Sequence, residues 1–280
     1  MLIAQISDTH MLPPGEIAYG LADTEAALVA AVAAVNAARP DLVIHTGDLA
    51  HHGAPEAYAL ALEILAEIEA PYCAIPGNHD DRANFRAAFR DAPWLPAHEA
   101  PDGFLHYALD AGPLRIVALD TVIPGRPDGE LCEARLDWLR EALGEAPGQP
   151  TVVAMHHPPF TAGLAGFSDK ALGGAARLAA ILGDNPQVVR VIAGHIHRSI
   201  VGMCGPAPVV VGPSASYPFA FDRAADAPLS ISFEAPGVAM HIWTEAHGLL
   251  SHTIALGERP PAKPLLKDGQ RLLPTSTRRA

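Results

Sequence analysis

The chain of 280 residues is long enough to form one large α/β domain with a sizeable core. Hydrophobic residues make up 49% of it and charged residues 18%, a balance that excludes wholesale disorder. The formal net charge of −12 disfavours a nucleic-acid polymer as partner, because such binding relies on clustered Lys and Arg. A small-molecule substrate fits this composition better.

The N-terminal segment and the cysteines bear on the compartment. The segment Met-Leu-Ile-Ala-Gln-Ile has no basic stretch and is followed by polar residues, so it predicts neither a signal peptide nor a membrane span. Cys73, Cys132 and Cys204 lie far apart without a C-x-x-C pair, which disfavours a zinc knuckle or a dense disulfide framework and leaves one disulfide open. We therefore expect a reduced, cytoplasmic protein.

Short apolar runs alternate with stretches of helical character, and several runs end in Asp, His, Gly or Asn. This pattern is typical of an α/β sandwich with its site at the strand ends. A first strand is expected at 2–7, followed by a helix at 23–38 that Asp23 caps. Further strands are predicted at 42–45, 72–75, 106–109, 114–119, 151–155 and 188–192, and further helices at 54–69, 81–89 and 131–143.

The second half of the chain gives a weaker pattern. Strands at about 208–211, 237–243 and 249–256 have helix-poor connections, which predicts a second sheet that is more antiparallel than the first. The segment 158–174 is long and irregular, so it forms either a lid or pocket wall or a surface loop without a role. The stretch 214–219 presents two aromatic rings either to a nucleotide base or to a partner subunit.

The C-terminal end differs in composition from the rest. From Gly257 the chain is rich in Pro and carries most of its charge as Lys and Arg. We therefore divide the chain into a domain at 1–256 and a tail at 257–280. The tail is either a solvated segment or an arm that packs on a neighbouring subunit. The absence of a repeat of 20 to 50 residues disfavours a solenoid or propeller.

Five short motifs follow predicted strands in turn: Asp8-Thr9-His10, Gly47-Asp48, Gly77-Asn78-His79-Asp80, His156-His157 and Gly194-His195-Ile196-His197. They offer two carboxylates, an amide oxygen and several imidazoles without a thiolate, a donor set that suits Mn, Fe, Zn or Co. Two divalent ions about 3.5–4 Å apart need one ligand that contacts both, and the short carboxylate of Asp48 is the candidate. Each motif alone is weak, but the five in this order indicate a dinuclear site.

The spacing within the motifs has a physical explanation. Alternation along a strand predicts that Asp8 and His10 point to the same side. His195 and His197 repeat this spacing, and a slight twist would send one imidazole to each ion. Glycines at 47, 77 and 194 let the backbone turn tightly as it leaves each strand.

The order of the motifs resembles that of the calcineurin-like metallophosphoesterases, D-x-H, G-D, G-N-H-[DE], H and G-H-x-H, over about residues 1–200. The stretches Ile-Ser-Asp-Thr-His, Ile-Pro-Gly-Asn-His-Asp-Asp and Met-His-His-Pro-Pro are similar to the class III cyclic-nucleotide phosphodiesterases and the related bacterial glycerophosphodiesterase. The resemblance implies an α/β fold, a four-layer α/β/β/α sandwich of two mixed sheets. It also favours a homodimer or larger homo-oligomer.

The resemblance further implies which residues hold the metals. The first ion would be held by Asp8, His10, Asp48 and His197, and the second by Asp48, Asn78, His156 and His195. His79 would lie beside the substrate phosphate rather than on a metal. No expected ligand position is substituted, which argues against an inactive relative.

These groups suggest a mechanism. Two ions would lower the pKa of bound water and neutralise the phosphoryl oxygens, so we expect in-line attack of hydroxide on phosphorus. Protonated His79 would donate to the leaving alkoxide, or it would instead orient Asn78 or Asp48. Of the other polar neighbours, we expect His157 and Asp80 to support the ligands or the fold, and His45 to pack or bond within its strand. His51 and His52, just after Asp48, either line the cleft or have no role in it.

The expected activity is hydrolysis of small phosphodiesters, either 3′,5′-cyclic nucleotides or glycerophosphodiesters. A phosphomonoesterase or nucleotidase on the same metal site is the main alternative, since selectivity depends on the surrounding loops. A non-catalytic scaffold is disfavoured by the intact ligand positions. A Rossmann-type nucleotide binder is discarded because no G-x-G-x-x-G follows the first strand. An aromatic base would favour stacking on Tyr217 or Phe219, whereas a glycerol group would not.

Overall fold

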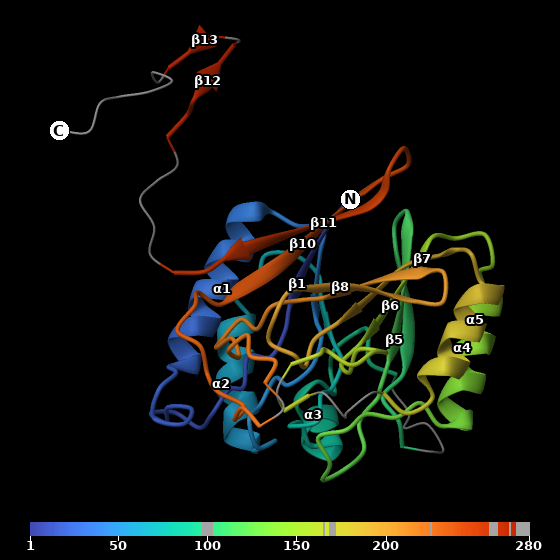
Figure 1. Ribbon diagram of the computed structural model, residues 1–280, viewed down its shortest axis with the longest axis horizontal. Coiled ribbons are helices and arrows are strands. Elements are labelled where there is room, and N and C mark those ends of the chain that lie inside the picture. The colour runs from blue at the N-terminus through green and yellow to red at the C-terminus, as the bar shows by residue number, and fades with distance from the viewer. Residues whose placement is uncertain are drawn as a thin grey trace.

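The computed structural model describes residues 1–96, 103–164, 166–167, 172–224, 226–257, 263–268 and 270–272. Two mixed β-sheets pack face to face, and helices cover the outer face of each sheet (Figure 1). The expected four-layer α/β/β/α sandwich is therefore confirmed. None of the helices in the described ranges has the length and apolar character needed to span a membrane. All three cysteines are free thiols.

The first sheet has five strands in the order β11-β10-β1-β2-β3. Strands β1 (Leu2–Ile6), β2 (Leu42–His45) and β3 (Tyr72–Ala74) are parallel, whereas β10 (Gly237–Thr244) and β11 (Gly248–Ala255) are antiparallel to their neighbours. The second sheet has six strands in the order β4-β5-β6-β7-β9-β8. Its members are β4 (Tyr107–Ala111), β5 (Leu114–Leu119), β6 (Thr151–Met155), β7 (Val188–Ala193), β8 (Ile200–Cys204) and β9 (Ala207–Val211).

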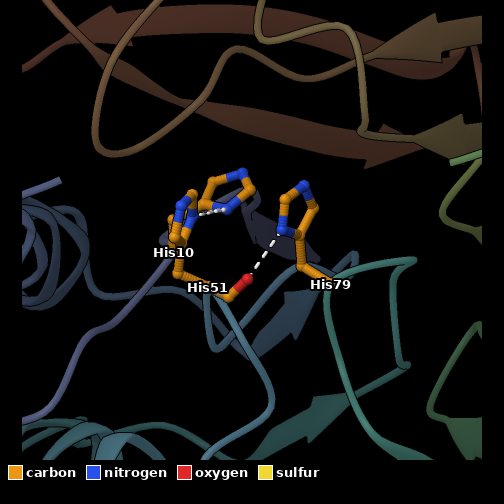
Figure 2. A group of neighbouring side chains, drawn as sticks. All are labelled: His10, His51 and His79. Carbon is orange, nitrogen blue, oxygen red and sulfur yellow. Dashed lines mark hydrogen bonds between the residues drawn. The ribbon is translucent and has the colours of Figure 1, made fainter. Parts of the chain in front are cut away.

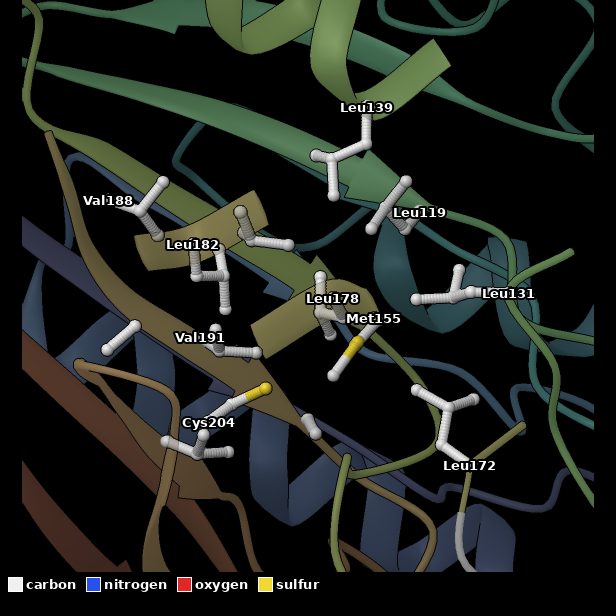
Figure 3. Packing of buried hydrophobic residues seen from close by; sticks show 14 of the residues in the cluster. Leu119, Leu131, Leu139, Met155, Leu172, Leu178, Leu182, Val188, Val191 and Cys204 are labelled. Carbon is white, nitrogen blue, oxygen red and sulfur yellow. The ribbon is translucent and has the colours of Figure 1, made fainter. Parts of the chain in front are cut away.

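Alternation along the strands builds the three apolar layers between these elements. In β5, Ile116 and Ala118 face the other sheet, while Val117 and Leu119 pack under α4 (Glu133–Gly144) and α5 (Ala175–Asp184). Figure 3 shows the leucines of the two helices lying over the strands of the second sheet. Both faces of the central strands are covered, which explains why they read as continuous apolar runs. The outer face of the first sheet is covered by α1 (Thr24–Ala38) and α2 (Pro55–Leu65).

Helix boundaries follow local side-chain bonds. Asp23 caps α1 as predicted, because its carboxylate accepts from the Ala26 amide at 2.9 Å. The short helix expected at 81–89 is α3 (Arg82–Ala88), which Asp81 caps in the same way. Helix α2 ends at Leu65, earlier than predicted. There the Asn36 side chain on α1 binds the carbonyl of Glu67 and the amide of Glu69, which holds these residues outside the helix.

The late strands do not form a separate, more antiparallel sheet, so that prediction was wrong. Strand β10 pairs with β1 and brings β11 with it, whereas β9 extends the second sheet in parallel with β7. The connections are helix-poor as expected, yet they cross between the two sheets. Strand β8 and helix α5 were not predicted. Helix α5 has a recognisable apolar face, with Leu178, Ile181 and Leu182 buried.

The division of the chain at Gly257 stays a prediction. Beyond it, the described residues include a small hairpin of β12 (Leu266–Lys267) and β13 (Gln270–Arg271), which extends away from the sandwich in Figure 1. Leu265, Leu266 and Leu272 are exposed there. Residues 258–262, 269 and 273–280 of the predicted tail lie outside the described residues.

Candidate metal centre

Five parallel strands end at one edge of the sandwich, and each is followed by one of the polar motifs. Strands β1 and β2 lead to Asp8, His10 and Asp48, and β3 leads to Asn78. Strands β6 and β7 of the second sheet lead to His156, His195 and His197. Because the carboxyl ends of parallel strands meet at the same edge, residues from both sheets converge at the junction between them.

The backbone at this edge is unusual. Asp8, His10, Asp48, His195 and His197 have positive φ angles of 54°, 47°, 54°, 73° and 56°. Non-glycine residues rarely adopt this region, at a cost of about 1–3 kcal/mol each, and such residues concentrate at functional sites. Strand alternation therefore does not explain how Asp8 and His10 come together, because β1 ends at Ile6 and both residues lie in the left-handed region beyond it.

The glycines contribute in two different ways. Gly47 has a φ of 96° and provides a turn of the kind that the sequence predicted. Gly77 and Gly194 are needed for close approach instead. A Cβ at Gly77 would lie 2.2 Å from Asp48 Oδ1, and one at Gly194 would lie 2.0 Å from Ser7 Oγ. The loops can cross at these distances only without a side chain.

One group of ligand atoms surrounds His10 and His197. Their Nε2 atoms are 2.9 Å apart, and His197 Nε2 lies 3.5 Å from Asp8 Oδ1. Asp48 Oδ2 is 3.6 Å from His10 Nε2. These side chains are buried.

A second group lies on the other side of Asp48. Asp48 Oδ2 is 3.3 Å from His156 Nε2, which is 3.1 Å from Asn78 Oδ1. The ring of His195 lies 5.2 Å from that of His156, measured between centroids. Asp8 and Asp48 also form, with His156, one of the clusters whose ligand atoms lie within 4.8 Å of one another. The carboxylate of Asp48 thus stands between the two groups.

The surrounding backbone fixes the orientation of these side chains. His156 Nδ1 bonds to the Thr46 carbonyl at 2.8 Å, and His197 Nδ1 bonds to the Tyr217 carbonyl at 2.6 Å. Each Nδ1 therefore carries the proton, and each Nε2 presents a lone pair to the centre. Asp48 Oδ1 accepts from the His79 amide at 2.8 Å, which leaves Oδ2 for the two groups.

The electrostatics of the cluster favour a bound cation. Burial lowers the pKa of His156, but the carboxylate of Asp48 outweighs it and raises that pKa to about 9. Burial raises the pKa of Asp48, yet the neighbouring imidazoles, His156 first, hold it well below its usual range. Burial raises the pKa of Asp8 to about 7, and the charge of Asp48 adds to that effect. Burial lowers the pKa of His10, His195 and His197, so these imidazoles are neutral and offer lone pairs. Together with the charged carboxylate of Asp48, these nitrogen and oxygen donors fit divalent metal ions.

Asp80 holds together the loops that carry two of the candidate ligands. Its carboxylate accepts from the amides of Leu49 and Ala50, from the amide of Gly77 and from the hydroxyl of Tyr58, at 2.8–3.1 Å. The loop after β2, with Asp48, is thereby tied to the loop after β3, with Asn78. These contacts agree with the supporting role expected of Asp80.

The remaining histidines differ in their surroundings. His79 is half-buried, and its Nδ1 donates to the carbonyl of His51 at 2.7 Å (Figure 2). His157 is buried, with its Nδ1 2.7 Å from Thr121 Oγ1 and its ring beside that of His195. His45 is buried as expected, but its bonds leave its strand: Nε2 bonds to Thr9 Oγ1 and Nδ1 accepts from the Gly47 amide. His52 is exposed, next to His51.

Aromatic rings line the centre on the side of the second sheet. Phe167, from the irregular segment 158–174, is buried with its ring 5.3 Å from that of His195, and Phe219 stacks on His197 at 4.2 Å. The remainder of that segment at 165 and 168–171 lies outside the described residues. Tyr19 was not predicted from the sequence. Its ring centroid lies 5.8 Å from that of Tyr217 and 5.2 Å from that of His51. The only sequence signal for Tyr19 was its position in a long loop after the first motif.

Comparison with known proteins agrees with this geometry. The family model described as calcineurin-like phosphoesterase matches residues 1–199. The chain is 34% identical over 261 residues to a protein of Arcobacter nitrofigilis named probable glycerophosphodiester phosphodiesterase GpdQ, covering 92% of this chain and 94% of the relative. It is 33% identical over 203 residues to the 3′,5′-cyclic adenosine monophosphate phosphodiesterase CpdA of Escherichia coli K12, covering 71% and 70%.

Solved structures show the same architecture. A dimetal phosphatase from Danio rerio superposes with a TM-score of 0.62 at 17% identity, covering 92% of this chain and 99% of that one. At this identity the likeness concerns the fold alone. The motifs, the order of the strands and the sequence relatives together show that the chain belongs to the calcineurin-like phosphoesterase family.

Proposed function

We propose that this chain hydrolyses small phosphodiesters at a centre of two divalent metal ions. The observation that carries the proposal is the position of Asp48, whose carboxylate lies within 3.6 Å of His10 in one group and 3.3 Å of His156 in the other. A shared carboxylate between two sets of donors is the arrangement that a pair of ions requires. The names of the relatives, which include a glycerophosphodiester and a cyclic-nucleotide phosphodiesterase, support diesters as substrates.

Seven side chains would hold the ions. Asp8, His10, Asp48 and His197 would bind the first, and Asp48, Asn78, His156 and His195 would bind the second. With no thiolate in the set, Mn, Fe, Zn and Co are the fitting metals. When bound, such ions make hydroxide available from water near neutral pH and neutralise the phosphoryl oxygens.

The side chains of the protein then act on the ester itself. The Nδ1 of His79 is held by the His51 carbonyl, so its Nε2 is the nitrogen left for the substrate. From this position protonated His79 donates to the leaving oxygen, which develops negative charge as the P–O bond breaks. Phe167 and Phe219 pack against the rings of His195 and His197 on the side of the second sheet.

The charge around the centre supports a diester over a monoester. A monoester dianion carries more negative charge than a diester and benefits from an additional cationic side chain. Within the described part of the chain, the candidate ligands bond to one another, to the side chains of Ser7 and His51 and to backbone groups, and to no Lys or Arg side chain. This surrounding suits a singly charged phosphodiester.

The test combines metal analysis with turnover. Purified protein loaded with Mn²⁺ should contain two equivalents per chain and should hydrolyse bis(p-nitrophenyl) phosphate faster than p-nitrophenyl phosphate. Parallel assays of cyclic AMP and glycerophosphodiesters would identify the natural class. Faster turnover of the monoester would favour the phosphatase alternative, and protein that binds metal without turnover of either ester would favour a scaffold.

The proposal extends to the assembly and the compartment. A homodimer or larger assembly is supported by Val201 and Met203, which are exposed on the edge strand β8, and by the exposed leucines of the tail hairpin. Light scattering of the full chain and of a chain ending at Leu256 tests this. If the truncated chain forms assemblies with the same number of subunits as the full chain, the tail takes no part in assembly. A cytoplasmic location is part of the same proposal.

A further inference from the structure

His51 is a buried histidine that contacts the candidate metal centre without belonging to its ligand set. It follows Asp48 by three residues in the loop after β2 and is 6% exposed. Figure 2 shows its ring against that of His10 and its carbonyl oxygen against His79. Two of the groups on which the proposed function depends are therefore held by one residue.

The backbone places His51 and His10 together. The amide of Met11 donates to the Leu49 carbonyl, and the amide of His51 donates to the Met11 carbonyl, both at 2.8 Å. The segment after β1 and the segment after β2 thus run side by side. As a result, the Nδ1 atoms of His10 and His51 lie 3.1 Å apart.

A bond between two ring nitrogens requires one donor and one acceptor. The Nε2 of His10 lies among the candidate ligand atoms, 2.9 Å from His197 Nε2 and 3.6 Å from Asp48 Oδ2. If His10 holds an ion through the lone pair of that Nε2, the proton of its ring would be on Nδ1. His51 Nδ1 is then the acceptor, and the ring of His51 carries its proton on Nε2.

We propose that His51 is a positioning residue for the metal centre, which accepts the Nδ1 proton of His10 and thereby presents His10 Nε2 as a ligand. The same residue fixes His79 through its carbonyl and stacks on it, with ring centroids 5.0 Å apart and planes at 20°. The inference rests on the proposed function, since it assigns His51 a role toward the same ions.

The test separates the acceptor from the bulk of the side chain. His51→Leu introduces an apolar side chain of similar size and removes the Nδ1 acceptor. His51→Asn places an amide oxygen near the position of Nδ1 and keeps it. Both variants retain the backbone carbonyl that binds His79. His252→Leu, the same change at an exposed histidine of β11, is the matched control.

The readout is the affinity of the metal-free protein for Mn²⁺, measured by competition with a chelator. His51→Leu should weaken binding by about 10- to 100-fold, the range seen when the outer partner of a metal-bound histidine is removed. His51→Asn and His252→Leu should bind Mn²⁺ nearly as well as the unchanged protein. Equal affinity of His51→Leu and the unchanged protein would overturn the inference, as would equal losses in the Leu and Asn variants.

A second measurement does not depend on the variants folding. In the unchanged protein loaded with diamagnetic Zn²⁺, nitrogen NMR of the imidazoles should show the proton of His10 on Nδ1 and that of His51 on Nε2. A proton on His51 Nδ1 would contradict the inference. An unchanged protein that binds neither metal would instead overturn the proposed metal centre itself.

Discussion

The two sheets contribute different chemistry to the centre. Loops after β1, β2 and β3 in the first sheet supply every oxygen donor, from Asp8, Asp48 and Asn78, and one imidazole. Loops after β6 and β7 in the second sheet supply imidazoles only. The second sheet also brings the aromatic rings that cover the centre.

This difference shows that neither sheet holds a complete site. In the proposed centre, the first ion would take three ligands from the first sheet and His197 from the second, while the second ion would take His156 and His195 from the second sheet. The centre therefore depends on the packing of the sheets through their shared apolar layer, in which Ile3 and Ile44 meet Ile116. Binding of metal should accordingly stabilise the packed state of both sheets.

The largest effect is expected at the residue that serves both groups. Asp48→Ala should lose both ions and reduce turnover by more than about a hundredfold. Loss of a residue that only supports a metal ligand costs up to about a hundredfold, and loss of a shared ligand should cost more. Metal analysis and diester turnover test this, with the exposed Asp91→Ala as control. Two ions still bound in Asp48→Ala would refute the shared carboxylate.

The loops after β2 and β3 cross so closely that one added methyl group should disturb them. Gly77→Ala would place a Cβ 2.2 Å from Asp48 Oδ1 and 2.3 Å from Asp48 N, so the carboxylate must shift. We expect weaker Mn²⁺ binding and lower turnover. Gly144→Ala, whose Cβ would meet no atom within 4 Å, is the matched control and should leave both unchanged. Normal metal affinity in Gly77→Ala would contradict the crowding.

His79 is not one of the candidate ligands, and its contact with Asp48 is made by its backbone amide. Replacing its side chain should therefore lower turnover without loss of metal. His79→Gln should retain two ions and lower kcat by about 10²- to 10⁴-fold, as for removal of a general acid. A diester with a better leaving group should be affected less, because its leaving oxygen needs less protonation. Unchanged kcat would remove His79 from the mechanism.

The smallest effect concerns the hydroxyl that supports Asp80 beneath the first sheet's loops. Tyr58→Phe removes one bond of 2.8 Å to a buried carboxylate and should lower the free energy of unfolding by about 1–2 kcal/mol. Urea unfolding of the metal-free protein measures this, and Tyr107→Phe, which loses a bond to the Ala74 carbonyl instead, provides the comparison. A variant as stable as the unchanged protein would show that Asp80 does not depend on this bond.

The strand bodies were predictable because their apolar character is local. β2 and β6 are buried on both faces, so their side chains reveal them without knowledge of their partners. The partners themselves were not predicted: β10 pairs with β1 from the other end of the chain, and an apolar pattern alone does not specify the partner strand. This explains why β10 and β11 were not assigned to the sheet of β1.

The site followed a similar division. The sequence motifs predicted that Asp8, Asp48 and Asn78 belong to one site, and the structure places them together. The backbone conformation of the site could not be predicted from the sequence, because the left-handed backbone at His10 or His195 is imposed by packing and not by residue type. Tyr19 could not be placed for the same reason, since its contacts arise from a loop without periodicity.

The central claim is that two ions share the carboxylate of Asp48. Electron paramagnetic resonance of the protein loaded with Mn²⁺ tests it most directly, because ions bridged by one carboxylate are magnetically coupled. We predict two Mn²⁺ per chain with a spectrum of a spin-coupled pair, replaced in Asp48→Ala by the spectrum of isolated or free Mn²⁺. One ion per chain, or two that show no coupling in the unchanged protein, would contradict the account.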